Sequence, residues 1–301
     1  MYTSALQTQV IRGRQEEDIL DWILPSSSKY ITPKHGKEFN DTCERFLRST
    51  EYLEWVGQGP STLICVGART ACIVRLSDFR LAGSGKSHLV FYPPQIFAWQ
   101  VRSVIFNRLL KTPELGILYF FFNHSDREQT AENVIRVLLR QLLDQLGKIP
   151  NDVRNEYSRY KNDPHKIMPD RDKYANMLKG SIEEFFKAKQ NRIFILVDAY
   201  DELLSSKEER LEKVAAERVA VRSCLAKLTE TENAKVLITT RSQHREELKQ
   251  SFVESNIVHI HGDLKDMTIY LENRMEPLNL QDAMKVEIIE TLLKKNEEEK
   301  W

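Results

Sequence analysis

The sequence lacks the features that would place it in several common classes of protein. Its 301 residues include only four cysteines, and none of them forms a Cys-x-x-Cys pair or stands near a histidine at zinc-site spacing. We therefore expect reduced thiols in an intracellular protein rather than a disulfide scaffold or a zinc site. Lysine plus arginine and aspartate plus glutamate both number 44, so the formal net charge is zero. This balance gives no reason to expect binding to nucleic acid or to an anionic membrane surface.

Long apolar segments are also missing. The longest run, residues 115–122 (LGILYFFF), is much shorter than the roughly 20 residues that a helix needs to cross a bilayer. No secretory signal pattern stands at the N-terminus. The sequence therefore predicts a soluble, cytoplasmic protein that has no membrane partner.

Short apolar runs alternate with helical patterns along most of the chain. The runs that have the composition of buried strands are residues 61–66, 115–122, 192–197, 234–240 and 256–260. Residues 130–146 carry apolar side chains every three or four positions, which predicts a helix ended by Gly147 and Pro150. Residues 205–228 predict a second helix with a highly charged face.

Two segments between these elements give weaker patterns. Residues 151–175 are polar and irregular, so we expect a long surface connection there. Ser181 and Glu184 stand at capping-box spacing, which predicts that a helix begins at that point.

Strands separated by helices of this length indicate an α/β fold, a three-layer sandwich with a mainly parallel sheet between helices. We expect N-terminal helices before it and a partial helical segment after it. The chain divides into a helical lead-in and linker (residues 1–58), the domain that contains the sheet (59–263) and the start of a helical subdomain (264–301).

One short stretch has the composition of a phosphate-binding loop: Gly83, Ser84, Gly85, Lys86 and Ser87. In a P-loop, consecutive backbone N–H groups point at phosphate oxygens, the lysine adds a positive charge, and the Ser/Thr hydroxyl binds magnesium. These five residues are therefore candidates for binding a nucleotide, and Ser87 is also a candidate magnesium ligand. A match this short also arises by chance, so it needs support from elsewhere in the chain.

An acidic cluster follows one of the predicted strands, in FILVDAYDE. Asp198 stands at the carboxyl end of the strand, where a carboxylate can hold magnesium. Asp201 and Glu202 follow within a turn, placed to orient or deprotonate an attacking water. The alternative interpretation is a strand that runs into an ordinary acidic turn.

A second strand ends in Thr239, Thr240 and Arg241. The carboxyl ends of parallel strands lie at one edge of a sheet, and ligands bind at that edge. Arg241 can there contact the terminal phosphate of a nucleotide or the leaving oxygen. The alternative is a surface arginine that only caps the strand.

The order GSGKS … YFFF … FILVDAYDEL … KVLITTRS resembles the NACHT group of signal-transduction NTPases of the STAND class, and in particular the nephrocystin-like NACHT domains of fungal repeat proteins. The resemblance extends over about residues 15–295. It implies a P-loop NTPase fold in which residues 83–87 are Walker A, Asp198, Asp201 and Glu202 are Walker B, and Arg241 is the sensor. Such proteins are nucleotide-controlled switches, often in immunity or cell-death signalling, which implies ATP or GTP with Mg and self-association or signalling partners.

The sequence departs from this family in three places. Arg80 stands where the loop should have its first glycine, Pro93 interrupts the helix expected after Lys86, and Ala199 replaces the glycine after Asp198. Removing residues 68–80 and 90–99 restores both the loop and the helix. Our hypothesis is that these segments are translated intron sequence, and the alternative is a pair of genuine loop insertions.

Three functions stay open from the sequence. The first is an NTPase switch with slow hydrolysis through Asp201 or Glu202. The second is a nucleotide-binding-deficient fragment or scaffold with a disrupted P-loop. The third, favoured least, is a P-loop kinase. Because family members continue into further domains, the resemblance also implies that the chain is a truncated one.

Overall fold

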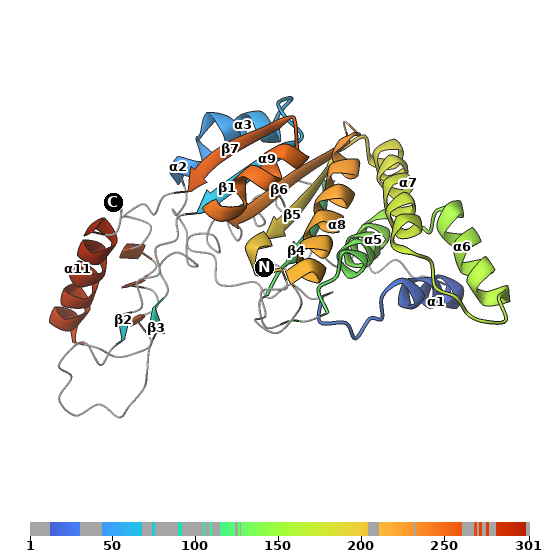
Figure 1. The fold of residues 1–301 in the computed structure, drawn as a ribbon, viewed down its shortest axis with the longest axis horizontal. Helices are drawn as coiled ribbons and strands as arrows, with labels where there is room; N and C mark the ends of the chain where they lie inside the picture. The colour runs from blue at the N-terminus through green and yellow to red at the C-terminus, as the bar shows by residue number, and fades with distance from the viewer. Residues whose placement is uncertain are drawn as a thin grey trace.

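The structure is a computed structural model that describes residues 13–30, 44–67, 74–75, 90–91, 105, 109, 115–123, 126, 128–203, 211–231, 233–260, 268–269, 271–272, 275–276 and 281–298. Its centre is a five-stranded sheet in which the strand order is β4-β5-β6-β1-β7 (Figure 1). All four neighbouring pairs are parallel. The strands are β1 (Thr62–Gly67), β4 (Gly116–Phe121), β5 (Ile193–Asp198), β6 (Ala234–Arg241) and β7 (Ser255–Ile260).

The chain changes direction across the sheet at β1. From β1 it passes to the far edge strand β4, returns through β5 and β6 to the neighbour of β1, and then reaches β7 on the other side. In open parallel sheets a crevice forms at such a reversal, outside the carboxyl ends of the strands. The topology therefore makes the carboxyl ends of β1, β5 and β6 the place to look for a site.

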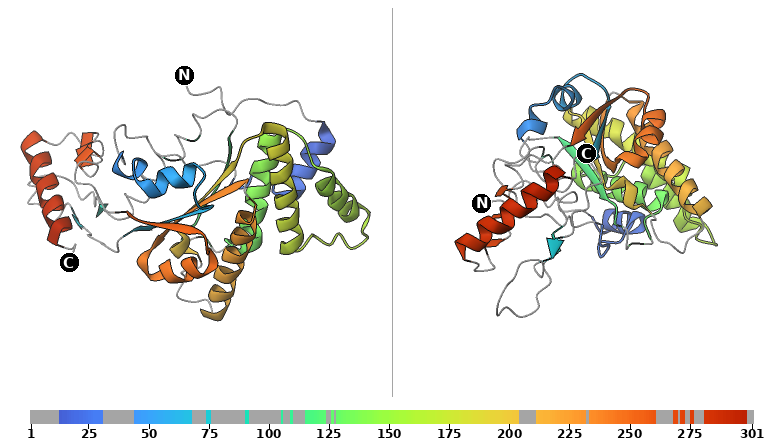
Figure 2. Two further views of the ribbon diagram at one scale, coloured as in Figure 1. Left: turned by 90° about the horizontal axis from the view of Figure 1, so that it is seen from above. Right: turned by 60° about the vertical axis from the view of Figure 1, so that its left-hand side comes forward.

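Helices cover both faces of the sheet, which confirms the predicted three-layer α/β fold. Figure 2 shows α3 and α8 on opposite sides of the sheet. The described helices are α1 (Arg14–Ile23), α2 (Glu44–Leu47), α3 (Thr50–Val56), α5 (Ala131–Leu146), α6 (Asn151–Asn162), α7 (Arg171–Lys189), α8 (Leu211–Thr229), α9 (Arg245–Ser251) and α11 (Asp282–Glu298), with the short 3-10 helices η2 (Tyr200–Glu202) and η3 (Ser242–His244).

Most of the buried apolar side chains form two clusters, one on each face of the sheet. The larger cluster joins α1, α5, α7 and α8 to side chains of the sheet such as Ile64 and Ile238. The smaller cluster joins Trp55 of α3, together with Ile105 and Leu109, to side chains such as Leu63 and Leu237. Alternate residues of one strand enter different clusters because successive side chains of a strand point to opposite faces.

The helix expected at residues 130–146 is confirmed as α5. The Thr130 side chain accepts a hydrogen bond from the N–H of Asn133 at its start, and Gly147 ends it with a left-handed φ of 71°. These are the capping residue and the C-terminal glycine that helix ends favour.

The expectation of an irregular connection at residues 151–175 is wrong. Helix α6 occupies most of that segment, and α7 begins at Arg171 after the N-cap Asp170. Only Val153 of α6 is buried, so the apolar period is weak, and the helix is held by ring contacts of Tyr157 and Tyr160 with Trp22 of α1. This partner is distant in the sequence and leaves no local pattern.

The helix start expected at Ser181 is wrong as well. Ser181 lies in the interior of α7, where its hydroxyl donates to the carbonyl oxygen of Met177 at 2.7 Å. A serine can make this bond to the preceding turn inside a helix, and then it caps nothing.

The two suspected insertions contribute a short antiparallel pair. Strand β2 (Val74–Arg75) pairs with β3 (Val90–Phe91), so that Val74 lies opposite Phe91. The predicted phosphate loop, Gly83 to Ser87, falls between these strands in the chain and lies outside the described residues.

Two further findings concern predictions made from composition. Over the part of the chain that the structure describes, no helix is both long and apolar enough to cross a bilayer. Cys65 and Cys224 are free, buried thiols.

Candidate functional site

The carboxyl ends of three strands bring four of the nine predicted site residues to one edge of the sheet, and the other five, Gly83 to Ser87, lie outside the described residues. Strand β5 ends at Asp198, and β6 ends at Arg241. Gly67, the last residue of β1, lies opposite Arg241 in the parallel register. Asp201 and Glu202 follow β5 in η2. The edge thus gathers Asp198, Asp201, Glu202 and Arg241 next to the end of β1.

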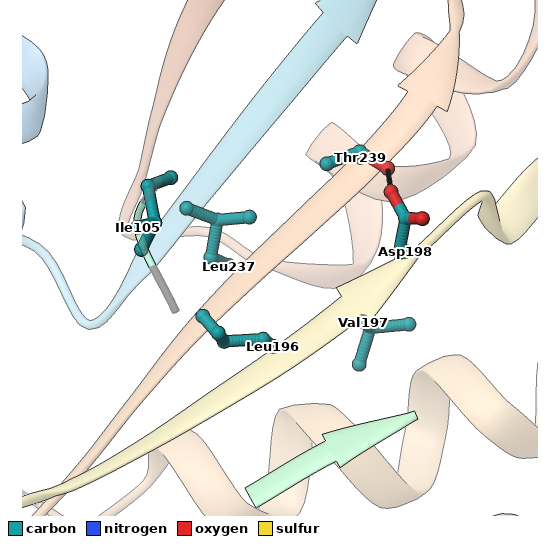
Figure 3. Close-up of a pocket in the computed structure, with 6 residues that line it drawn as sticks. All are labelled: Ile105, Leu196, Val197, Asp198, Leu237 and Thr239. Atoms are coloured by element: carbon teal, nitrogen blue, oxygen red, sulfur yellow. Dashed lines mark hydrogen bonds between the residues drawn. The ribbon is translucent and has the colours of Figure 1, made fainter. Parts of the chain in front are cut away.

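Thr239 fixes the carboxylate of Asp198. Its hydroxyl donates to Asp198 Oδ1 at 2.6 Å (Figure 3). The same hydroxyl accepts from the N–H of Ala199 at 2.9 Å. Both side chains are buried. A short hydrogen bond to a carboxylate is among the stronger ones in proteins. Thr239 therefore couples the end of β5 to β6 and holds Asp198 in one orientation.

A small pocket opens beside this pair. It is lined by Ile105, Leu196, Val197, Asp198, Leu237 and Thr239 (Figure 3). Ile105 comes from the part of the chain that follows the predicted phosphate loop, and it is fully buried against the smaller cluster. The chain therefore leaves the sheet at Gly67, before the predicted loop, and is back against the end of β5 at Ile105, after it.

Ala199 turns the chain from β5 into η2 with a left-handed backbone, φ 55° and ψ 46°. Glycine adopts this conformation without strain, whereas a residue with a Cβ pays about 1–2 kcal/mol. The structure thus explains why glycine suits this position and why Ala199 is a departure with a physical cost.

Asp201 and Arg241 form an ion pair. Arg241 Nε lies 2.9 Å from Asp201 Oδ2, and the exposed fractions of the two side chains are 42% and 7%. Arg218 of α8 adds two longer hydrogen bonds from Nη2, to the carbonyl oxygens of Asp201 and Leu203, both 3.4 Å. Glu202 is half-buried, and its N–H donates to the Ala199 carbonyl at 2.8 Å.

A second layer of polar residues supports η2 and was not predicted from the sequence. Arg222 Nη1 donates to the hydroxyl of Tyr200 at 2.7 Å and lies 2.9 Å from Glu247 Oε2. Burial raises the pKa of Tyr200 to about 12, so the phenol stays protonated. These residues belong to three different elements and form no sequence motif. They come together around the buried Tyr200 only in the folded structure, so no local sequence signal could identify them.

The same edge keeps the thiol of Cys65 neutral. Cys65 lies opposite Thr239 in the register of β1 and β6. Burial, and after it the negative charge of Asp198, raises the pKa of this thiol far above its ordinary value. A protonated thiol is a poor nucleophile, so Cys65 is a packing residue here.

The family of the chain follows from a comparison with known proteins. The family model described as "Nephrocystin 3, N-terminal" matches residues 41–241. The chain belongs to this nephrocystin-3 N-terminal family. The match begins after α1, ends with β6, and includes every residue that the sequence predicts for the site, from Gly83 to Arg241.

Comparisons with individual proteins add less than this nephrocystin-3 N-terminal match. No curated protein matches the chain. Among solved structures, a chain of the E. coli MS115-1 HORMA:CdnC:Trip13 complex is similar, with 12% sequence identity and a TM-score of 0.29. The similarity covers 65% of this chain, which spans 64% of that one.

Among the described residues no group of three or more His, Cys, Asp or Glu could hold a metal ion, so a magnesium ion here would take Asp198 as a single carboxylate ligand. Mg²⁺ is held by one or two carboxylates together with phosphate oxygens and water, rather than by a cage of protein ligands. Asp198 supplies a buried carboxylate whose orientation is fixed by Thr239. Its surroundings therefore suit a site that is completed by a phosphate group.

Proposed function

We propose that this chain binds a nucleoside triphosphate, ATP or GTP, together with Mg²⁺, at the carboxyl edge of the sheet. One observation carries the proposal. Asp198 is held by Thr239 at the end of β5, at the same edge of the sheet as Gly67 and in one pocket with Ile105, which precede and follow residues 83–87 in the sequence. A fixed carboxylate beside a phosphate-binding loop is the arrangement that a magnesium nucleotide requires.

The residues divide into three tasks. The backbone of Gly83, Ser84 and Gly85 and the side chain of Lys86 would bind phosphate oxygens. Ser87 and Asp198 would hold the magnesium, which neutralises phosphate charge when it is bound. Arg241 would contact the terminal phosphate.

Slow hydrolysis is part of the proposal. Asp201 or Glu202 would orient or deprotonate the attacking water. Their place in η2, directly after Asp198, supports this role because the water must lie close to the terminal phosphate.

We also propose the wider role of a STAND-type switch in an intracellular signalling or immunity-like response. The support is the order of motifs that resembles NACHT proteins together with membership of the nephrocystin-3 N-terminal family. Cytoplasmic location and self-association or signalling partners belong to this proposal.

Equilibrium binding of a fluorescent ATP analogue in the presence of Mg²⁺ tests the nucleotide site. Lys86→Ala should weaken binding at least tenfold, since it removes the positively charged side chain that would contact the phosphates. Lys189→Ala is the matched control, because Lys189 is exposed at the end of α7. If wild type and Lys86→Ala bind alike, or neither binds, the chain is a scaffold with a disrupted P-loop. Competition by unlabelled ATP and GTP then identifies the preferred base.

The suspected insertions allow a second comparison. A variant without residues 68–80 and 90–99 restores the complete loop and the helix that follows it. We expect this variant to bind the analogue more tightly than the wild-type chain, because the first glycine permits a closer backbone approach to phosphate. Sequencing of a spliced transcript over codons 67–101 shows independently whether the two segments are translated intron.

A further inference from the structure

The ion pair between Asp201 and Arg241 indicates different roles for Asp201 and Glu202, the two acidic residues of η2. The carboxylate of Asp201 is enclosed, with 7% of its side chain exposed, whereas 42% of the Arg241 side chain is exposed. A buried carboxylate needs its cationic partner, because an uncompensated charge in the interior is strongly unfavourable. The pair therefore fixes the inner end of the Arg241 guanidinium.

The contact uses the nitrogen of Arg241 that lies nearest its aliphatic stem. Nε meets Asp201 Oδ2 at 2.9 Å. The other N–H donors of a guanidinium lie on its two terminal nitrogens, and these form the fork that binds a phosphate or carboxylate. An arginine held through Nε in this way presents its fork in one direction.

Further contacts join the backbone of η2 to α8. Arg218 Nη2 donates to the carbonyl of Asp201, and the neighbouring Tyr200, fully buried, bonds to Arg222 of the same helix. Asp201 is therefore tied to α8 and to the end of β6, and it cannot move toward a substrate without breaking these contacts.

We propose that Asp201 is a positioning residue that directs Arg241 toward the terminal phosphate, and that Glu202 is the acidic group that meets the attacking water. This inference rests on the proposed function. A general base must come within hydrogen-bond reach of the water. Glu202 is half-buried and so less enclosed than Asp201, whose carboxylate is bonded to a guanidinium.

The ratio of ATP to ADP affinity tests this assignment without relying on hydrolysis. If Arg241 contacts the terminal phosphate, Asp201→Asn and Arg241→Ala should each reduce the preference for ATP about tenfold. The double variant should lose no more than Arg241→Ala alone, since one residue acts through the other. Arg241→Lys keeps a positive charge beside Asp201 and should fold, yet it should also lose the preference for ATP because lysine has no fork.

Glu202→Gln should keep the affinities for ATP and ADP and lower the rate of hydrolysis at least about a hundredfold.

Two outcomes would overturn the assignment, and they differ. If Asp201→Asn abolishes hydrolysis but keeps the ATP preference, Asp201 is itself the base and the division of roles is wrong. If wild type and Lys86→Ala fail alike to bind nucleotide, the proposed function fails, and this inference fails with it.

An independent observation concerns the edge strand β4. Two glutamine side chains of α5 bond to its backbone on the side away from β5. The N–H of Ile117 donates to Gln145 Oε1 at 2.9 Å, and Gln145 Nε2 donates back to the Ile117 carbonyl at 2.7 Å. Gln141 makes the same two bonds with Tyr119, at 2.8 and 3.1 Å. Gln129 bonds in the same manner to Asn123 beyond the end of the strand.

The spacing of these side chains matches the strand. Residues 141 and 145 are one helical turn apart, roughly 6 Å along the axis, and residues 117 and 119 are separated by about 6.6 Å along the strand. A primary amide carries the donor and the acceptor that a peptide group of a further strand would offer. The glutamines thus occupy the hydrogen-bonding positions of the next strand.

We infer that Gln141 and Gln145 close this edge of the sheet against pairing with a second copy of the chain. Open edge strands are templates for intermolecular pairing, and proteins block them in various ways. Here the block is specific, because both polar groups of Ile117 and of Tyr119 are satisfied by side chains of the adjacent helix.

Hydrogen exchange over residues 115–122 tests the inference. Gln141→Met and Gln145→Met, combined, keep the shape of the side chains and remove the amides. In the dilute monomer, exchange at Ile117 and Tyr119 should accelerate at least about fivefold, and the variant should form dimers as its concentration increases. Glu183→Met is the control, because it adds the same apolar group at an exposed position of α7. Unchanged exchange in the double variant, or equal self-association in the control, would overturn the inference.

Discussion

The two faces of the sheet are packed in different ways, and the difference shows how the site is supported. The larger cluster is several layers deep, because α5 lies on the sheet while α7 and α1 pack against α5 in turn. Among the described residues, the smaller cluster joins side chains of α2, α3 and the strands to Ile105 and Leu109, and it borders the pocket beside Asp198. Over the described residues, the pocket therefore lies on the face with fewer covering layers, the thin face, and the larger cluster forms the thick face.

This asymmetry separates stability from binding. Residues of the thick face join α5, α7 and α8 to the strands, and of these described residues Val197 alone lines the pocket. On the thin face, Ile105, Leu196 and Leu237 line the pocket, so we expect their substitution to cost less stability. Substitutions on the two faces should therefore have different costs even where the residue type is the same.

A matched pair of leucines gives the largest expected contrast. Leu138 in the middle of α5 and Leu237 on β6 are both buried, but Leu237 borders the pocket (Figure 3). Leu138→Ala should lower the free energy of unfolding by about 4 kcal/mol and Leu237→Ala by about 2 kcal/mol, because a side chain next to a void loses fewer contacts. Urea unfolding measures both values. Equal losses would show that the two faces do not differ in packing.

The outermost layer of the thick face gives the next effect. Trp22 of α1 packs against the rings of Tyr157, Tyr160 and Tyr174 at centroid distances of 5.4 to 6.3 Å. Trp22→Ala should destabilise the protein by about 3 kcal/mol, and Trp22→Phe, which retains an aromatic ring, should recover most of that loss. If Trp22→Ala unfolds at the same urea concentration as wild type, α1 is an appendage rather than part of the core.

These packing relations mark the limit of what the sequence predicts. The structure confirms the five strands of the sheet and α5, which could be predicted because local apolar periods and capping residues mark them. The helix α6 was missed because its partner Trp22 is distant in the chain. At the site, the presence of Asp198, Asp201 and Arg241 on one edge follows from parallel strands. The pairing of Arg241 with Asp201 does not, because it depends on the turn at Ala199 and on Arg218 of α8.

The turn at Ala199 provides a smaller, stabilising prediction at the junction of the two faces. Its left-handed φ of 55° strains any residue that carries a Cβ. Ala199→Gly should raise the free energy of unfolding by about 1 kcal/mol, since glycine adopts this φ without strain. Gln190, which has a φ of 56° at the end of α7, offers the control substitution Gln190→Gly far from the site. If only the control variant gains stability, the strain at Ala199 is already relieved by its neighbours.

The smallest expected effect is a pH dependence of the stability of the fold, which arises at His244 behind the site, on the thick face. Burial, and after it the charge of Arg218, lowers the pKa of His244, although Glu247 and Asp201 oppose the shift. A histidine whose pKa is lower in the folded protein binds fewer protons there than in the unfolded chain. Its contribution to stability is therefore complete above pH 6.5, the ordinary pKa, and is lost as the pH falls through the lower folded value. His244→Gln should remove this decline between pH 7 and pH 5, which thermal unfolding at several pH values can measure. A decline that is equally steep in the variant would assign it to the acidic groups of the same network, because Glu247 lies 2.8 Å from His244 Nδ1 and also pairs with Arg222.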